Sequence, residues 1–103
     1  MRLKILFAAA VLITANPAFA SEDDKIEYGE YLSGSCVTCH QLSGADNGIP
    51  AIVGWDKEAF VEVLLSYKTK ERENKAMQTV AIPLSREEME ALAAYFATIA
   101  PKE

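Results

Sequence analysis

The chain has 103 residues, half of them hydrophobic, and a formal net charge of −5 at pH 7. This length leaves room for one domain. The acidic balance argues against nucleic acid or an anionic membrane as a partner, because both carry negative charge, and it is compatible with docking to a basic protein surface.

Residues 1–20 have the three parts of a secretory signal peptide. Two basic residues precede an apolar run over residues 5–13, and Ala18 and Ala20 place small side chains where a signal peptidase reads them. A transmembrane anchor needs about 20 apolar residues, and this run is shorter. We therefore expect export to the periplasm, cleavage after Ala20 and no stable membrane insertion. The remaining residues 21–103 carry a net charge of −7.

A first helix is predicted from Lys25 to Ser33. Asp24 is its expected N-cap, and Glu27 stands at the position that completes a capping box. A glycine on its inner face would let another element approach closely. The residues that share this face are Ile26, Gly29 and Leu32.

Cys36, Cys39 and His40 form the one strong motif of the chain. The C-x-x-C-H spacing is the attachment sequence for haem c. Two thiols about one helical turn apart can add across the two vinyl groups of one haem. The histidine is then held beneath the iron and supplies the proximal imidazole ligand.

The two cysteines also allow three other interpretations. A thioredoxin-like redox pair needs a βαβ setting that this sequence lacks. A zinc site would require four ligands, and the chain offers two Cys and one His. A disulfide between Cys36 and Cys39 would close only a short loop and stabilise the domain slightly. A domain of this size commonly needs an additional constraint, and covalent haem would supply it.

Residues 41–55 are predicted to be a loop, because glycines and a proline recur along them. A metal-bound histidine usually donates its second ring N–H to a carbonyl or carboxylate. The Pro50 carbonyl, ten residues after His40, is a candidate acceptor. An ordinary turn proline is the alternative.

A second helix is predicted after Asp56, ending near Lys68, because apolar residues recur there at helical spacing. Residues 69–83 are polar at first and then apolar, and we predict an irregular loop. Basic residues at the end of the helix and in this loop alternate with Glu71 and Glu73. This pattern favours a solvated mixed-charge segment over a docking patch at the haem edge. The basic residues are Lys68, Lys70, Arg72 and Lys75.

The last predicted helix follows Ser85 as N-cap, with Glu88 closing a capping box and Leu84 packing on Met89. Pro101 prevents its continuation. Its expected buried face consists of Met89, Leu92, Phe96 and Ile99. No segment alternates long enough to indicate a strand, so we predict an all-α domain of about three to four helices with long loops. Long loops in a compact domain suggest that they enclose something.

The sixth iron ligand is inferred by elimination. His40 is the only histidine, and Met1 leaves with the signal peptide. Met89 is assigned to the core, which leaves Met77 in the loop. The alternative is that Met77 fills a gap in the core. Ligation by a thioether and an imidazole raises the reduction potential, as an electron carrier requires.

Four aromatic residues are predicted to be walls of the core and of the haem pocket, namely Trp55, Phe60, Tyr67 and Phe96. Two of them, Trp55 and Tyr67, carry polar hydrogens that would meet a haem propionate or the Met77 sulfur.

With these residues placed, the chain resembles class I cytochromes c over residues 27–99. Residues 48–54 are similar to the family's Gly-x-Pro-x-Leu-x-Gly loop, and residues 92–96 to its C-terminal helix, which crosses the first helix near Gly29. Residues 60–96 are similar to the cytochrome subunit of flavocytochrome c sulfide dehydrogenase and to single domains of cytochrome c4-type proteins.

The resemblance implies a class I cytochrome c domain over residues 21–103 that holds one haem c and transfers single electrons without being an enzyme itself. It also implies redox protein partners, among them a flavoprotein subunit that oxidises sulfide or another sulfur compound. The alternatives are a free periplasmic shuttle, a haem sensor with an open sixth position, and a haem-free dithiol oxidoreductase.

Overall fold

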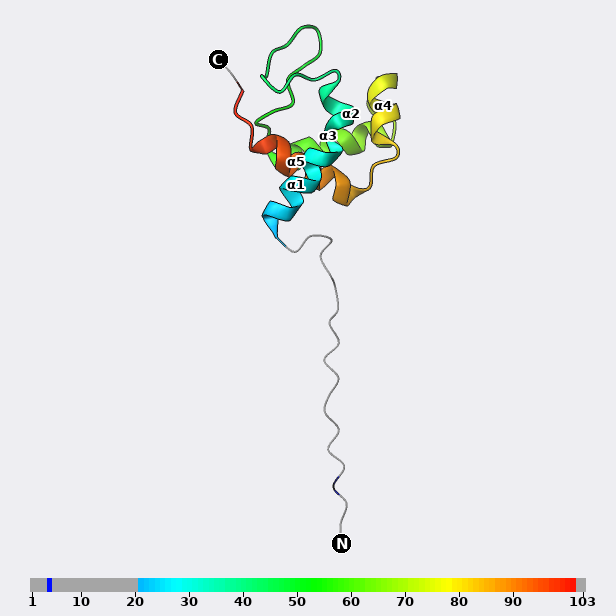
Figure 1. The fold of residues 1–103 in the computed structure, drawn as a ribbon. Helices are drawn as coiled ribbons and strands as arrows, with labels where there is room; N and C mark the ends of the chain where they lie inside the picture. Colours follow the sequence, from blue (N-terminus) through cyan, green and yellow to red (C-terminus); the bar gives the residue numbers. More distant parts are fainter. Residues whose placement is uncertain (1–3, 5–20, 102–103) are drawn as a thin grey trace.

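The computed structural model describes residue 4 and residues 21–101, and within them it contains five helices and no strand (Figure 1). The helices are α1 (Glu22–Leu32), α2 (Gly34–Val37), α3 (Lys57–Lys68), α4 (Lys75–Ala81) and α5 (Arg86–Ala97). The all-α prediction is confirmed, with two short helices, α2 and α4, beyond the three that were predicted. Apart from Lys4, the signal peptide expected over residues 1–20 lies outside the described residues.

Helix α1 begins three residues earlier than predicted. Its N-cap is Ser21, whose hydroxyl accepts the backbone N–H of Asp24 at 3.1 Å, so Asp24 lies inside the helix. Both residues are good caps, and the earlier one allows three acidic side chains to lie in the first turn, where the helix dipole favours negative charge. These are Glu22, Asp23 and Asp24.

The first and last long helices cross at Gly29, as the resemblance implied. A Cβ atom at this position would lie 2.0 Å from the carbonyl oxygen of Ala91 and 2.8 Å from Cβ of Tyr95, both in α5. The side chain of any other residue would therefore collide with backbone that belongs to the partner helix. Glycine is what allows α1 and α5 to approach this closely.

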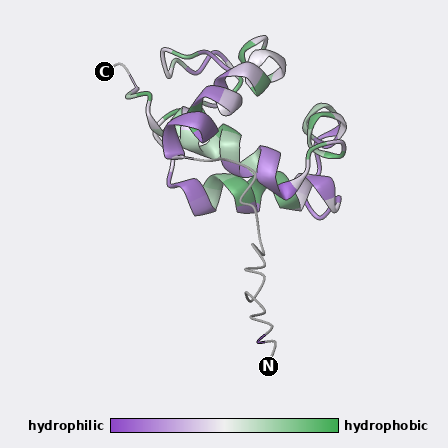
Figure 2. Ribbon diagram, turned by 60° about the horizontal axis from the view of Figure 1, so that its bottom comes forward, coloured by the Kyte–Doolittle hydropathy of each residue, from purple (hydrophilic) through white to green (hydrophobic). Residues whose placement is uncertain are grey.

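The core lies where α5 packs against α1 and α3. Phe96, Met89 and Leu92 are its largest fully buried side chains, and α3 contributes Phe60 and Leu64. Figure 2 shows hydrophobic helical segments in the middle of the domain and hydrophilic ones at its periphery. No helix in the described part of the chain is both long enough and apolar enough to cross a membrane.

The prediction of an irregular loop over residues 69–83 was wrong in part, because α4 lies within it. Asn74 caps this helix by accepting the backbone N–H of Met77 at 3.0 Å. The helix was missed because Ala81 is its only buried residue, so no apolar stripe with helical spacing marks it. Met77 therefore lies on a helix and not in a loop.

The predicted cap of α5 is present. The Ser85 hydroxyl accepts the N–H of Glu88 at 3.1 Å, and the Glu88 carboxylate accepts the N–H of Ser85 at 2.9 Å. This second hydrogen bond is the main reason that the pKa of Glu88 is lowered. The charged form is thus favoured in the folded state.

Replacing Glu88 by Gln is expected to lower stability at about pH 7 and to have little effect in acid. The folded pKa lies below the unfolded value of about 4.3, so the carboxylate stabilises the fold above that pH and ceases to do so as the pH falls through the folded value. We expect a loss of about 0.3–1 kcal/mol at neutral pH, typical of a charge at a helix N-terminus. Urea unfolding of both proteins at about pH 7 and about pH 3 measures it. An equal difference at both pH values would contradict the prediction.

Candidate functional site

The cysteine motif spans the end of α2 and the turn that follows it. Cys36 is in α2, and the chain turns after it so that the backbone N–H of His40 donates to the Cys36 carbonyl at 2.8 Å. This is one turn of helical geometry, which brings Cys36 and His40 to the same side. Both thiols are free: Cys36 is half-buried and Cys39 is exposed. Burial raises the pKa of the Cys36 thiol, and a hydrogen bond with Ser35 opposes this in part.

The His40 ring is buried and oriented by the loop that follows it. Its Nδ1 atom lies 2.6 Å from the carbonyl oxygen of Pro50. A carbonyl oxygen can only accept a hydrogen bond, so Nδ1 must carry the hydrogen. The lone pair of the neutral ring is then on Nε2, the nitrogen that is left for a metal. The sequence prediction had named this Pro50 contact, and the structure contains it.

The loop over residues 41–56 is itself tied to the last helix. The backbone N–H of Gly54 donates to the Phe96 carbonyl at 3.0 Å, and Gly54 has a φ of 73°, a conformation that glycine adopts easily. The loop predicted over residues 41–55 contains no helix or strand in the structure, and it extends to Asp56. The acceptor for His40 is thus held by backbone contacts with the core helix.

These residues meet in a cleft lined by α2, the 41–56 loop, α3 and α4. The cleft and its open mouth contain about 1070 Å³ of space free of protein atoms. The cleft proper has a volume of about 260 Å³. Ligand sites commonly have volumes of about 300–1,000 Å³, so a large cofactor would also occupy the open mouth. The predicted site residues in its lining are Cys36, Cys39, His40, Pro50, Trp55, Tyr67 and Met77.

Met77 reaches the cleft from α4, whereas His40 reaches it from the turn after α2. Met77 is half-buried, and Met89 is fully buried in the core, as the elimination required. The structure thus brings one imidazole and one thioether to a common space from different parts of the fold.

The two aromatic residues line the cleft, but they differ in their polar contacts. The Trp55 indole N–H donates to the Ala51 carbonyl at 3.1 Å, a contact within its own loop. The Tyr67 ring lies beneath the Arg72 guanidinium, with 5.7 Å between the guanidinium carbon and the ring centroid. Tyr67 is therefore a wall of the cleft that also anchors the segment leading to α4.

Several apolar lining residues were not predicted to be in the site. Val63 and Leu64 belong to the apolar stripe of α3, and they also line the cleft. The signal that could have revealed them is the width of the apolar stripe on α3, which exceeds what one packed partner helix covers. The other unpredicted apolar residues are Ile49, Ile52, Ala76 and Val80.

The lining fits haem c in its chemistry. Two free thiols at the attachment spacing lie beside a histidine whose Nε2 is available, and a thioether enters the same space from another helix. Most of the remaining wall is apolar, which suits the porphyrin face. Carboxylate and ammonium groups are absent from the described lining.

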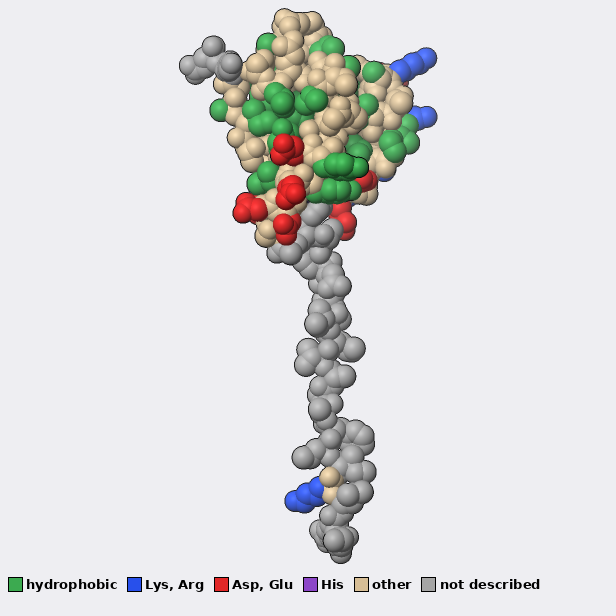
Figure 3. All heavy atoms as spheres, viewed as in Figure 1, with side chains coloured by type: hydrophobic (Ala, Val, Ile, Leu, Met, Phe, Trp, Pro, Cys, Tyr) green, Lys and Arg blue, Asp and Glu red, His purple; other side chains and the backbone are tan. Residues whose placement is uncertain are grey.

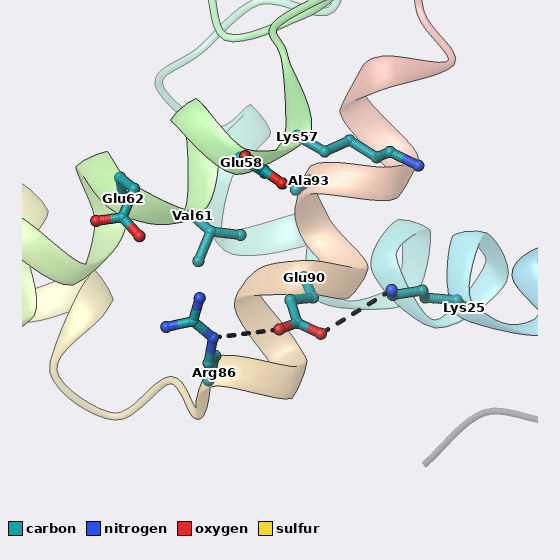
Figure 4. Close-up of a pocket in the computed structure, with 8 residues that line it drawn as sticks. All are labelled: Lys25, Lys57, Glu58, Val61, Glu62, Arg86, Glu90 and Ala93. Atoms are coloured by element: carbon teal, nitrogen blue, oxygen red, sulfur yellow. Dashed lines mark hydrogen bonds and ion pairs between the residues drawn. The ribbon is translucent and has the colours of Figure 1, made fainter. Parts of the chain in front are cut away.

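A different cleft lies between α1, α3 and α5 and has another character (Figure 4). It contains about 780 Å³ including open space, and its walls carry three basic and three acidic side chains. Glu90 forms ion pairs there with Arg86 at 3.3 Å and with Lys25 at 4.0 Å. Lys57 pairs instead with Glu22, outside the lining, and none of the predicted site residues lies in this cleft.

No curated protein matches the chain. The family profile for cytochrome c, in contrast, matches residues 26–100, which contain the motif, the cleft and all the long helices except the first turns of α1. This family carries covalent haem c and transfers electrons, which agrees with the thiols, the imidazole and the apolar cleft. The chain therefore belongs to the cytochrome c family.

Proposed function

We propose that this chain is a periplasmic monohaem electron-transfer protein in which His40 and Met77 are the axial iron ligands. The observation that carries the proposal is the orientation of His40. Its Nδ1–H is engaged by the Pro50 carbonyl, so Nε2 remains as the ligand atom in a cleft that Met77 also lines.

When bound, haem c supplies an iron centre that accepts and releases one electron. The chain's own residues attach, orient and shield this centre. Cys36 and Cys39 supply the thiols for attachment, and the apolar walls keep water from the cleft. A thioether ligand and a dry environment both favour the reduced state and so raise the reduction potential.

The proposed location is the periplasm, on the basis of the signal-peptide pattern in residues 1–20. Surface charge bears on the choice of partner. Figure 3 shows acidic side chains gathered around α1, whereas basic side chains project on the side of α4. Complementary charge on a partner would therefore determine which side it meets.

We propose as partner a flavoprotein that oxidises sulfide or another reduced sulfur compound. The basis is the resemblance of residues 60–96 to the cytochrome subunit of flavocytochrome c sulfide dehydrogenase. A free periplasmic shuttle is the alternative. Purification from the native host distinguishes them. A subunit would copurify with a yellow flavin chromophore at fixed stoichiometry, and a shuttle would elute alone.

Replacing Met77 by Ala tests the ligand assignment. We expect the variant to lose the thioether-to-iron absorption at the red end of the oxidised spectrum. Its reduction potential should fall by roughly a few tenths of a volt, within the ~0.8 V range over which axial ligands set haem potentials. Absorption spectra and a redox titration of the holoprotein measure both effects.

Met89→Leu is the matched control, because Leu fills the core in place of Met at a cost of about 1.5 kcal/mol or less. It should keep the band. A band that survives Met77→Ala would assign the ligand elsewhere. Ready CO binding to the reduced wild type, with a five-coordinate spectrum, would favour a sensor with an open sixth position.

A further inference from the structure

Helix α4 carries the proposed ligand Met77, yet the protein core holds it weakly. It has seven residues, of which only Ala81 is buried, and it packs mainly against α3. Helices much shorter than about 12 residues are not stable by themselves in water. Contacts outside the helix must therefore fix its position.

The N-terminal end of α4 is fixed by local hydrogen bonds. Asn74 caps the helix, and the Gln78 side-chain amide donates to the Arg72 carbonyl at 2.9 Å. The Arg72 Nε–H in turn donates to the Ser66 hydroxyl at 3.2 Å, in the last turn of α3. These contacts join the start of α4 to the end of α3 through the intervening loop.

At the C-terminal end of α4, Ala81 is buried in the core, and the side chain of Lys68 supplies polar contacts to the residues that follow. Lys68 is the last residue of α3 and is half-buried. Its ammonium group donates to the carbonyl of Ile82, the C-cap of α4, at 3.0 Å, and also to the carbonyl of Leu84. Carbonyls at the end of a helix lack intrahelical partners, and a cation there also complements the helix dipole.

We propose that Lys68 is a positioning residue for the sixth iron ligand: it ties the segment after α4 to the end of α3 and so holds Met77 in the cleft. This inference rests on the proposed ligation by Met77. Without the ammonium group, both carbonyls would turn to water and the end of α4 would be free to move away from α3. Met77 would then spend less time at bonding distance from the iron.

The test compares oxidised holoproteins with Lys68 replaced by Leu, which keeps an apolar side chain but has no donor. We expect loss or marked weakening of the thioether-to-iron band and a fall in the midpoint potential. Hydrogen exchange of the α4 amides should accelerate by about tenfold or more, as expected from the loss of charged hydrogen bonds, while α5 exchange is unchanged.

Two further variants separate positioning from charge. Lys68→Arg retains donors for the carbonyls and should restore the band and the potential. Lys57→Leu removes the same charge from the exposed start of α3, where Lys57 pairs with Glu22 at 3.4 Å, and should change neither. If Lys68→Leu fails to accumulate with haem, Lys68→Ala, which also lacks a donor, is used in its place and should show the same losses.

The proposal is overturned if Lys68→Leu, or Lys68→Ala in its place, keeps the band, the potential and the α4 exchange of Lys57→Leu. In that case Met77 ligation would stand if Met77→Ala still abolishes the band. If Met77→Ala instead leaves the wild-type band, the ligation itself is wrong and the role of Lys68 falls with it.

Discussion

Replacing both Cys36 and Cys39 by Ser is expected to yield a chain without covalent haem that does not unfold cooperatively. The described residues form a small core, and part of the apolar surface of α3 faces the cleft instead of another helix. Without haem, cleft walls such as Ile52 and Val63, which are only half-buried by the protein, would be left facing water. A domain of this size buries too little surface to tolerate that loss.

Haem staining of a denaturing gel tests the attachment, and circular dichroism during heating tests the fold. Thr38→Ser is the control, because it introduces the same residue type at an exposed position between the two cysteines. It should keep haem and a sharp transition. A cooperative thermal transition in the double cysteine variant would show that the polypeptide core suffices alone.

Replacing Gly29 by Ala is expected to destabilise the fold by about 3 kcal/mol, at the upper end of what overpacking costs. The new methyl group would lie 2.0 Å from a backbone oxygen of α5, which cannot rotate away as a side-chain end can. The expected sign is opposite to that of helix propensity, which favours Ala over Gly by roughly 0.5–1 kcal/mol. The midpoint temperature should fall by roughly 10–20 °C for a domain of this size.

Gly34→Ala is the matched control for this substitution. Gly34 also lies in a helix, but a Cβ atom there would meet nothing within 4 Å. It should leave stability unchanged or raise it by about 1 kcal/mol or less. Urea unfolding measures the free energy of unfolding of Gly29→Ala and of Gly34→Ala. Similar stabilities would mean that α1 and α5 separate at little cost.

The parts of the fold that the sequence predicted are those in which one stretch of chain contains both the cap and the buried face. Helix α5 is the clearest case, because Ser85 and Glu88 mark its start and Met89 to Phe96 its inner side. Helix α3 was predicted for the same reason. The start of α1 was misplaced because two competent caps, Ser21 and Asp24, stand three residues apart, and neither has an apolar neighbour to decide between them.

Helix α4 shows where prediction from sequence fails. Its position depends on Lys68, Arg72 and Asn74, which are polar residues that give no periodic signal. The hydrogen bond from the Trp55 indole N–H to a backbone carbonyl of its own loop likewise gives no periodic signal in the sequence. In the site, the motif and the Pro50 acceptor were readable because chemistry requires those groups at those spacings. The apolar walls were not, because core and cofactor both attract the same side chains.

The partner of His40 is a main-chain oxygen, and this has a consequence for the electronic properties of the ligand. A carboxylate in the same place would take up a proton as the pH falls. A substitution of its residue could also remove the acceptor. An amide carbonyl does neither. The electron-donating power of the imidazole therefore does not depend on the pH of the compartment through this acceptor. It also does not depend on the side chain at the acceptor position, provided that the loop keeps its backbone conformation.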